Sequence, residues 1–192
     1  MVDTVYLLRH GHIDNGGEKR YLGQTDLGLD ALGIEQAYAL REAFQSVPFD
    51  AVYTSPLKRC VKTAHIISQE YRIVEALREI DMGAWENKTM AEIRLSDPES
   101  YAQRGADLEY FTPPEGESFH SVAKRVQEAF DAITCEAIHS CVIIVAHAGV
   151  NRVLLSSLLN LPIQEMMRID QPYACVNRLT RYHGTWRYER GF

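Results

Sequence analysis

Residues 4–11, "TVYLLRHG", join an unbroken apolar run to an arginine, a histidine and a glycine. A short apolar run bounded by polar residues predicts a strand that is buried on both faces, as in a parallel sheet. Arg9 and His10 then stand at the carboxyl end of that strand. Because ligands bind beyond the carboxyl ends of such strands, Arg9 and His10 are the first candidates for a functional site.

Strand-like and helix-like segments alternate along most of the chain. Further strands are predicted within residues 49–55 and 141–149, and residues 72–80 are predicted to hold a short strand and a loop. Helices are predicted over residues 29–46, 57–71, 119–138 and 150–160. Asp30 and Ser118 stand where a side chain caps the start of a helix. The alternation predicts an α/β fold, a three-layer α/β/α sandwich around a mostly parallel sheet.

Two segments depart from this alternation. Residues 87–115 are polar and rich in turn formers, which predicts short helical stretches at most. Residues 174–190 predict a hairpin that turns at His183-Gly184. The edge of this hairpin could pair with a second copy, so we expect either a monomer or a homodimer.

The length suits one domain over residues 1–192, and the net charge of −6 argues against nucleic acid or a membrane surface as the main partner. No stretch approaches the roughly 18 apolar residues of a membrane span. Asp3 stands where a signal peptide carries positive charge. The four cysteines show neither C-x-x-C nor zinc-ligand spacing, which is typical of free thiols in a reducing compartment. We therefore expect a cytoplasmic protein.

His10, His12 and Asp14 also form an H-x-H-x-D pattern, which is typical of metallo-hydrolases. The metallo-β-lactamase form of this motif continues with a histidine, whereas this chain has Asn15. The amidohydrolase form needs a full (β/α)₈ barrel, for which 192 residues are too few. The sequence therefore favours a site that uses neither a metal nor an organic cofactor.

Phosphoryl transfer without a metal needs a nucleophile, cations for the phosphate oxygens, a further hydrogen-bond donor and an acid for the leaving group. His10 is the candidate nucleophile, and Arg9 beside it can fork onto two phosphate oxygens. Arg59 lies near the start of the helix predicted over residues 57–71, and His147 directly follows an apolar run. Because these residues stand at the carboxyl ends of three predicted strands, we expect them to meet.

Five motifs extend this pattern along the chain. They are "LLRHG" (7–11), "YTSPLKRCVKTA" (53–64), "LREIDMGAWEN" (77–87), "PEGES" (114–118) and "VIIVAHAGVNR" (142–152). In this order they resemble the histidine phosphatase superfamily, which has the phosphoglycerate mutase-like fold. The match runs from residue 4 to about residue 160. The short bacterial branch of α-ribazole phosphatase-like and broad-specificity phosphatases is the most similar, and residues 21–37 resemble it too.

The resemblance implies a role for each candidate. His10 becomes a phosphohistidine, while Arg9, Arg59 and His147 bind the phosphoryl group. Glu79 protonates the leaving oxygen and then activates the water, two roles that microscopic reversibility assigns to one residue.

Other positions near these motifs carry weaker implications. Glu86 is an alternative acid, although its place after Trp85 indicates the start of a helix, and Trp85 itself indicates core packing. The resemblance implies that Gln24 and Ala148 bind substrate. Arg152 is expected on a helix face near the cleft.

The sequence departs from the family after "RHG". His12 and Ile13 replace the usual Glu or Gln and Ser or Thr, and His12 is expected in the pocket wall against the leaving group. The family's asparagine phosphate ligand falls six residues after the nucleophile, where this chain has Gly16. Either Asn15 or the backbone N–H of Gly16 is therefore the expected ligand.

Residues 87–117 are expected to cover the site, and their charge bears on the reaction. Mutases that resemble this family carry a long basic insertion here, whereas residues 87–113 hold five acids and three bases (Glu92, Asp97, Glu99, Asp107, Glu109, Lys88, Arg94, Arg104). This favours a phosphatase over a mutase or a non-catalytic phosphate-binding relative. The expected substrate is a small phosphorylated metabolite. Tyr101, Tyr110 and Phe111 could stack on a ring such as that of α-ribazole 5′-phosphate, or they could equally be packing residues.

Overall fold

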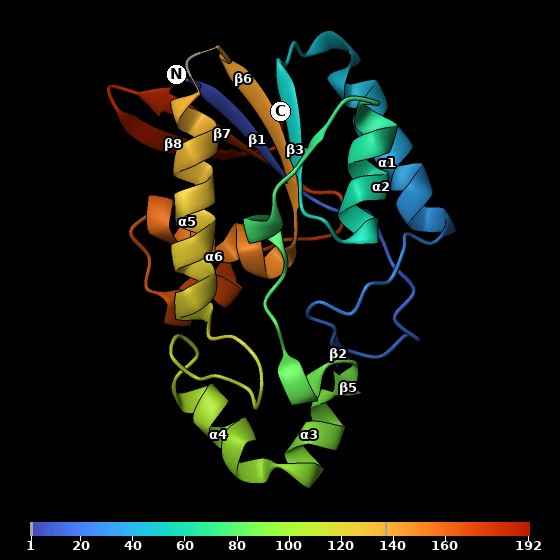
Figure 1. The fold of residues 1–192 in the computed structure, drawn as a ribbon, viewed down its shortest axis with the longest axis vertical. Coiled ribbons are helices and arrows are strands. Elements are labelled where there is room, and N and C mark those ends of the chain that lie inside the picture. The colour runs from blue at the N-terminus through green and yellow to red at the C-terminus, as the bar shows by residue number, and fades with distance from the viewer. Residues whose placement is uncertain (1, 137) are drawn as a thin grey trace.

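A computed structural model of the chain describes residues 2–136 and 138–192. In them, six strands form one mixed sheet in the order β4-β3-β6-β1-β7-β8 (Figure 1). The strands are β1 (Thr4–Arg9), β3 (Ala51–Thr54), β4 (Arg72–Ile73), β6 (Cys141–Ala146), β7 (Val176–Tyr182) and β8 (Thr185–Arg190). β4, β3, β6 and β1 are parallel, and the β7–β8 hairpin is antiparallel at the other edge. The predicted mostly parallel sheet and the predicted C-terminal hairpin are both confirmed.

Helices cover both faces of the sheet, with α1 (Ala31–Ala43) and α2 (Lys58–Ile67) on one side and α5 (Phe119–Cys135) and α6 (Ala148–Leu158) on the other (Figure 1). Alternate residues of each strand face the two sides. Leu7 of β1 belongs to the core under α5 and α6, whereas Leu8 belongs to the core under α1 and α2. The predicted three-layer sandwich is confirmed.

The predicted caps hold two of these helices at their first residues. The Asp30 carboxylate accepts the N–H of Gly33 at 2.8 Å, and the Ser118 hydroxyl accepts the N–H of Ser121 at 3.2 Å. Two helices end earlier than predicted. α2 ends at Ile67 rather than at residue 71, and α5 ends at Cys135 rather than at residue 138. Position 137 lies outside the described residues.

Of the two remaining strand predictions, one is confirmed and one was too long. Residues 72–80 were expected to hold a short strand and a loop, and Arg72 and Ile73 pair with β3 before the chain turns into a 3₁₀ helix. β6 ends at Ala146, opposite the last residue of β1, and α6 begins two residues later rather than at residue 150. The described 3₁₀ helices are Phe44–Ser46, Glu75–Leu77, Gly83–Trp85 and Ile163–Arg168.

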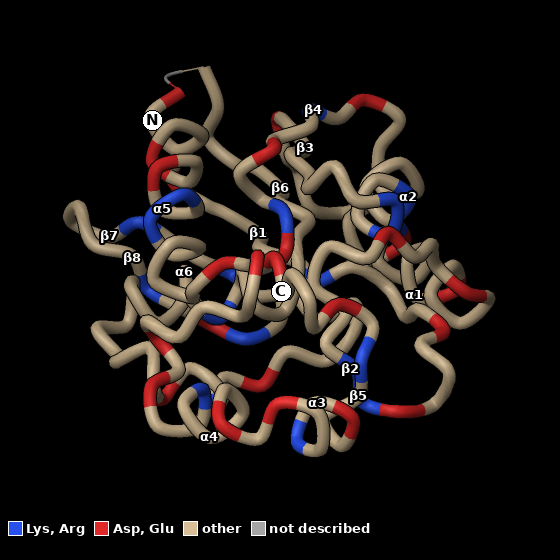
Figure 2. Tube along the Cα trace, turned by 60° about the horizontal axis from the view of Figure 1, so that its bottom comes forward, with Lys and Arg blue, Asp and Glu red and all other residues tan. Residues whose placement is uncertain are grey.

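Residues 87–117, the cover segment, are more regular than predicted. They contain β5 (Lys88–Thr89), which pairs with β2 (Arg20–Tyr21), and the helices α3 (Met90–Ser96) and α4 (Pro98–Ala106). Figure 1 shows this segment beyond one end of the sheet, and Figure 2 shows acidic residues along α3 and α4. A capping box between Thr89 and Glu92 starts α3, and Pro98 starts α4 after its cap Asp97. None of the described helices has both the length and the apolarity of a bilayer span.

Candidate active site

The carboxyl ends of β1, β3 and β6 meet at one edge of the sheet, as the sequence predicted. Arg9 lies opposite Ala146, and Thr54 lies opposite Val145. The next residues are therefore neighbours, and the ring centroids of His10 and His147 are 5.2 Å apart. A cavity of about 480 Å³ opens at this edge and is lined by Arg9, His10, Arg59 and Glu79 among others.

His10 is 3% exposed, and its tautomer follows from one hydrogen bond. Nδ1 lies 2.7 Å from the carbonyl oxygen of Gly11. Because a carbonyl only accepts, Nδ1 carries the proton and Nε2 keeps its lone pair. Burial lowers the pKa of His10 well below its usual value, and the charges of Arg59 and Arg9 lower it further. His10 is therefore a neutral ring with one nucleophilic nitrogen.

Arg59 is 2% exposed and is fixed by three acceptors. Its Nη1 donates to the carbonyl of Thr25 at 2.7 Å, its Nη2 donates to the carbonyl of Gly23 at 2.8 Å, and its Nε donates to Nδ1 of His147 at 3.3 Å. None of these acceptors is a carboxylate, so the positive charge of Arg59 is not neutralised by them. A fixed cation beside His10 is what a transferring phosphoryl group requires.

His147 lies behind this pair and is fully buried. Since its Nδ1 accepts from Arg59, its Nε2 carries the proton and donates to Ser55 Oγ at 2.8 Å. Cys60 Sγ lies 3.4 Å from the same Nε2. His147 is not among the residues that line the cavity. In the structure, His147 contacts Arg59 and helps to orient it. Direct contact between His147 and the phosphoryl group stays a prediction.

Arg9 is positioned by a segment that the sequence did not point to. Its Nη1 donates to the main-chain carbonyl of Gln171 at 2.5 Å, and the ring of Tyr173 lies 3.7 Å from Arg9 Cζ. The buried side chain of Gln171 is itself held by Asn151 at 3.0 Å and by Asn177 at 2.8 Å. These contacts join distant parts of the chain, so no local pattern indicates them.

We expect the Tyr173 ring to matter for catalysis, because it keeps the Arg9 guanidinium in place by a cation–π contact. Tyr173→Leu should lower kcat/KM for p-nitrophenyl phosphate about tenfold, the usual size of such a contact. Tyr173→Phe keeps the ring, so its kcat/KM for p-nitrophenyl phosphate should stay within about twofold of the wild-type value. Steady-state rates for both variants measure this. Equal losses in the two variants would show that the ring does not act through Arg9.

Glu79 reaches the cavity from the loop after the 3₁₀ helix Glu75–Leu77. Its Oε2 accepts the N–H of Gly149 at 3.0 Å, near the N-terminus of α6, where a helix stabilises negative charge. A Cβ at Gly149 would overlap this carboxylate, so a larger residue there would displace the Glu79 side chain. The main-chain carbonyl of Glu79 accepts from Gln24 Nε2 at 3.1 Å and from Arg125 Nη2 at 3.2 Å.

Glu86, the alternative acid, faces a different set of partners. Its carboxylate accepts the N–H groups of Gln24, Thr25 and Met82, at 2.8, 2.8 and 3.0 Å. It follows the 3₁₀ helix Gly83–Trp85 and does not start a helix, so that prediction was wrong. Because Glu86 ties the loop around Gln24 in place and does not line the cavity, the structure favours Glu79 as the acid. The predicted core packing of Trp85 is confirmed, since it is 2% exposed.

The remaining predicted residues divide into two groups. Asn15, Ala148 and Arg152 line the cavity. Gln24 and Gly16 do not, because the Gln24 amide is bound to Glu79 and the N–H of Gly16 donates to Asp14 at 2.9 Å. Of the two alternatives for the phosphate ligand, the structure therefore brings Asn15 to the site and not Gly16.

His12 was expected in the pocket wall, and the structure places it elsewhere. Its Nδ1 lies 2.6 Å from Asp30 Oδ2, and its ring is 4.7 Å from that of Tyr173. The cap of α1 thus draws His12 away from the cavity lining. Within residues 2–136 and 138–192, no three His, Cys, Asp or Glu side chains are grouped to hold a metal ion.

The aromatic residues of the cavity are not those that the sequence suggested. Phe111 packs on Trp85 at 5.3 Å and Tyr110 stacks on His120 at 4.8 Å. Tyr101 packs against the core, and none of the three predicted rings lines the cavity. Tyr21, Phe119 and Tyr173 line it instead, together with Arg104 of the cover segment.

A neutral, buried histidine beside two fixed guanidinium groups, with a carboxylate on the same cavity, defines an enzyme of phosphoryl transfer through a covalent histidine. More particularly, the chain belongs to the histidine phosphatase superfamily (branch 1), whose family model matches residues 5–191. The family and its phosphatase members identify it as a phosphoric monoester hydrolase.

Individual relatives differ in what their names say they act on. The adenosylcobalamin/α-ribazole phosphatase of Escherichia coli (strain K12) is 29% identical over 173 residues, which are 87% of this chain and 85% of that protein. The 6-phosphofructo-2-kinase/fructose-2,6-bisphosphatase 3 of Homo sapiens is 34% identical over 179 residues, which are 92% of this chain but 34% of that longer protein. The crystal structure of the α-ribazole phosphatase from Shigella flexneri matches with a TM-score of 0.89 and 26% identity, over 97% of this chain and 95% of that one.

Proposed function

We propose that residues 1–192 form one catalytic domain, a phosphomonoesterase that works through a phosphohistidine on His10 without a metal cofactor. The observation that carries the proposal is the tautomer of His10, whose Nδ1–H is bound to Gly11 so that Nε2 is free to attack. Arg9 and Arg59 supply the positive charge that a metal supplies in other phosphatases.

The reaction has two steps that use the same groups. First, Nε2 of His10 attacks phosphorus, the P–O ester bond breaks, and Glu79 gives its proton to the leaving oxygen. Next, Glu79 takes a proton from water as the water oxygen attacks phosphorus, and the P–N bond breaks to release phosphate and neutral His10. Asn15 and the α6 start at Ala148 lie where they can contact the phosphoryl oxygens or the leaving group.

The first candidate substrate is α-ribazole 5′-phosphate, within the broader class of small phosphorylated metabolites. The names of two relatives support it, and so do the rings of Tyr21, Phe119 and Tyr173 in the cavity lining. Phosphoryl transfer of the cofactor-dependent mutase type is the alternative. The short cover segment disfavours it, because mutases that resemble this family carry a long basic insertion at this place.

We also propose that the enzyme is cytoplasmic, acting as a monomer or a homodimer. All four cysteines are unpaired thiols, which fits a reducing compartment.

The test is hydrolysis of p-nitrophenyl phosphate by the purified protein, with and without EDTA, together with acid-quench trapping of the phosphoenzyme. We expect activity that survives EDTA and an acid-labile phosphate on His10. Activity that is lost with EDTA and restored by a divalent ion would overturn the metal-independent mechanism. Release of phosphate to water, rather than transfer to a second hydroxyl, separates the phosphatase from the mutase.

A further inference from the structure

The cavity has a charge opposite to that of the whole chain. The net charge of the protein is −6. Of the described residues that line the cavity, Glu79 is the one acid, against Arg9, Lys19, Arg20, Arg59, Arg104 and Arg152. Two of these cations, Arg9 and Arg59, already serve the transferring phosphoryl group. The others line the remainder of the cavity.

Among these others, Arg104 has an unusual environment. It extends from α4 and is half-buried, with its Cζ 5.2 Å from the ring centroid of Tyr21 and 6.0 Å from that of Phe119. In the described part of the chain, no carboxylate oxygen lies within ion-pair distance of it. Burial lowers the pKa of Arg104, and no acidic side chain opposes that effect apart from the weak influence of two tyrosines.

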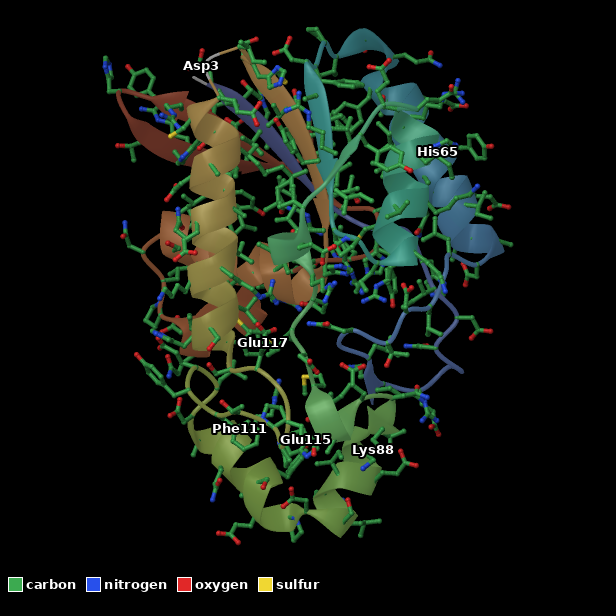
Figure 3. All side chains as sticks on the ribbon, in the orientation of Figure 1. Asp3, His65, Lys88, Phe111, Glu115 and Glu117 are labelled. Atoms are coloured by element: carbon green, nitrogen blue, oxygen red, sulfur yellow. The ribbon has the colours of Figure 1, made fainter. Side chains whose placement is uncertain are left out.

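Another half-buried arginine shows how the fold normally satisfies such a charge. Arg125 of α5 forms a bidentate ion pair with Glu117. Its Nε donates to Oε1 and its Nη2 donates to Oε2, both at 2.9 Å. Figure 3 shows Glu117, the last residue of the cover segment, beside the start of α5. Arg20 in the cavity wall is likewise paired, with Glu18 at 3.0 Å. Arg104 therefore differs from Arg125 and Arg20, because it lines the cavity with no carboxylate paired to its guanidinium.

A guanidinium that is partly removed from water and has no anion beside it is destabilising, and an incoming anion recovers part of that free energy. The two rings beneath Arg104 restrict it to one place, which lowers the entropy lost on binding. The fork matches a carboxylate or a phosphoryl group, each of which can accept two parallel hydrogen bonds.

We propose that Arg104, resting on Tyr21 and Phe119, binds a second anionic group on the leaving-group part of the substrate. The natural substrate then belongs to the phosphomonoesters that carry a carboxylate or a second phosphoryl group. This deepens the proposed function and rests on it, because the leaving group is defined by attack of His10. The inference keeps the broader class of small phosphorylated metabolites. It replaces α-ribazole 5′-phosphate as the first candidate, because the neutral base of that compound lacks the group that Arg104 would bind.

The experiment compares substrates that differ in the second anion. One pair is glycerol 3-phosphate and 3-phosphoglycerate, which adds a carboxylate. The other is fructose 1-phosphate and fructose 1,6-bisphosphate, which adds a phosphoryl group. The wild type should prefer the doubly anionic member of at least one pair by about tenfold or more in kcat/KM, and the pair that shows this identifies the anion.

Arg104→Gln should abolish that preference, mainly by raising KM for the doubly anionic substrates. It should lower kcat/KM for p-nitrophenyl phosphate by much less, because that substrate has no second anion. Arg104→Lys keeps the charge and should retain part of the preference. Arg94→Gln is the matched control, because Arg94 is an exposed arginine of the same cover segment outside the cavity lining. This variant also removes one positive charge from the cover segment, and it should leave kcat/KM unchanged for every substrate.

The outcomes separate the two proposals. Equal use of both members of each pair by the wild type, or an equal loss on every substrate in Arg104→Gln, would overturn the role of Arg104. A wild type that cannot hydrolyse p-nitrophenyl phosphate would overturn the proposed function instead. Binding of the doubly anionic substrates to His10→Ala protein, measured by calorimetry with and without Arg104→Gln, then decides the role of Arg104 without turnover.

Discussion

Replacing His10 with alanine is expected to lower kcat by about four orders of magnitude or more, the usual result of removing a covalent nucleophile. The reason is specific to this site. The nucleophilic Nε2 exists because Gly11 holds the proton on Nδ1 and because burial keeps the ring neutral. Alanine leaves the two cations in place but supplies no atom to accept the phosphoryl group. Steady-state hydrolysis of p-nitrophenyl phosphate and phosphoenzyme trapping measure the loss.

The variant must be shown to fold, since His10 is almost fully buried. Its thermal unfolding curve should remain cooperative. His65→Ala is the matched control, because His65 is an exposed histidine of α2, far from the cover segment in Figure 3. It should keep full activity. A His10→Ala protein that retains the wild-type rate would assign the phosphoryl acceptor to another residue.

The sequence predicted those parts of the structure that depend on local pattern. The run before Arg9 and the run before His147 are apolar on every residue, so both were recognisable as strands buried between two layers of helices. Parallel strands end at a common edge, and this rule alone brought Arg9, His10, Arg59 and His147 together. The caps Asp30 and Ser118 were also predictable from the sequence. A capping side chain accepts an N–H only two or three residues further along the chain, so the pattern lies within one short segment.

The residues that the sequence missed act through contacts between distant segments. Tyr173 and Gln171 reach Arg9 from a loop more than 160 residues along the chain. Nothing in "DQPYAC" indicates that its carbonyl and its ring would enclose an arginine. Arg104 was counted among the three bases of an acidic cover, and its separate position on the cavity is visible only once α4 is placed over Tyr21. Charge counted along a segment did not predict charge at the cavity.

Glu86 shows how a local pattern can mislead. An acid after a tryptophan at the end of a loop is typical of the first turn of a helix, and that was the interpretation. In the structure, the acid accepts three backbone N–H groups from two loops that the chain must bring together. The acid does accept backbone N–H groups that would otherwise be unpaired, as a helix-capping acid would. Those N–H groups belong to loops and not to a helix.

Glu79→Gln should slow phosphorylation of His10 by an amount that depends on the leaving group. An alkoxide cannot leave without a proton, so kcat/KM for glycerol 3-phosphate should fall by about 10²–10⁴-fold, the range for loss of a general acid. Nitrophenolate leaves without a proton, so kcat/KM for p-nitrophenyl phosphate should fall by less than about tenfold. Glutamine is nearly isosteric, and its amide oxygen can still accept the N–H of Gly149, so the loop should stay in place.

The comparison must use kcat/KM rather than kcat, because kcat/KM reports the steps up to the first phosphorylation, whereas kcat includes hydrolysis of the phosphohistidine. In that second step Glu79 acts as the base for water whatever the substrate was, so kcat should fall for both. Glu115→Gln serves as the control, since Glu115 is an exposed carboxylate of the cover segment (Figure 3) and should leave both constants unchanged. Equal losses of kcat/KM for the two substrates would mean that Glu79 does not protonate the leaving group, and that its carboxylate serves only to hold the start of α6 against the cavity.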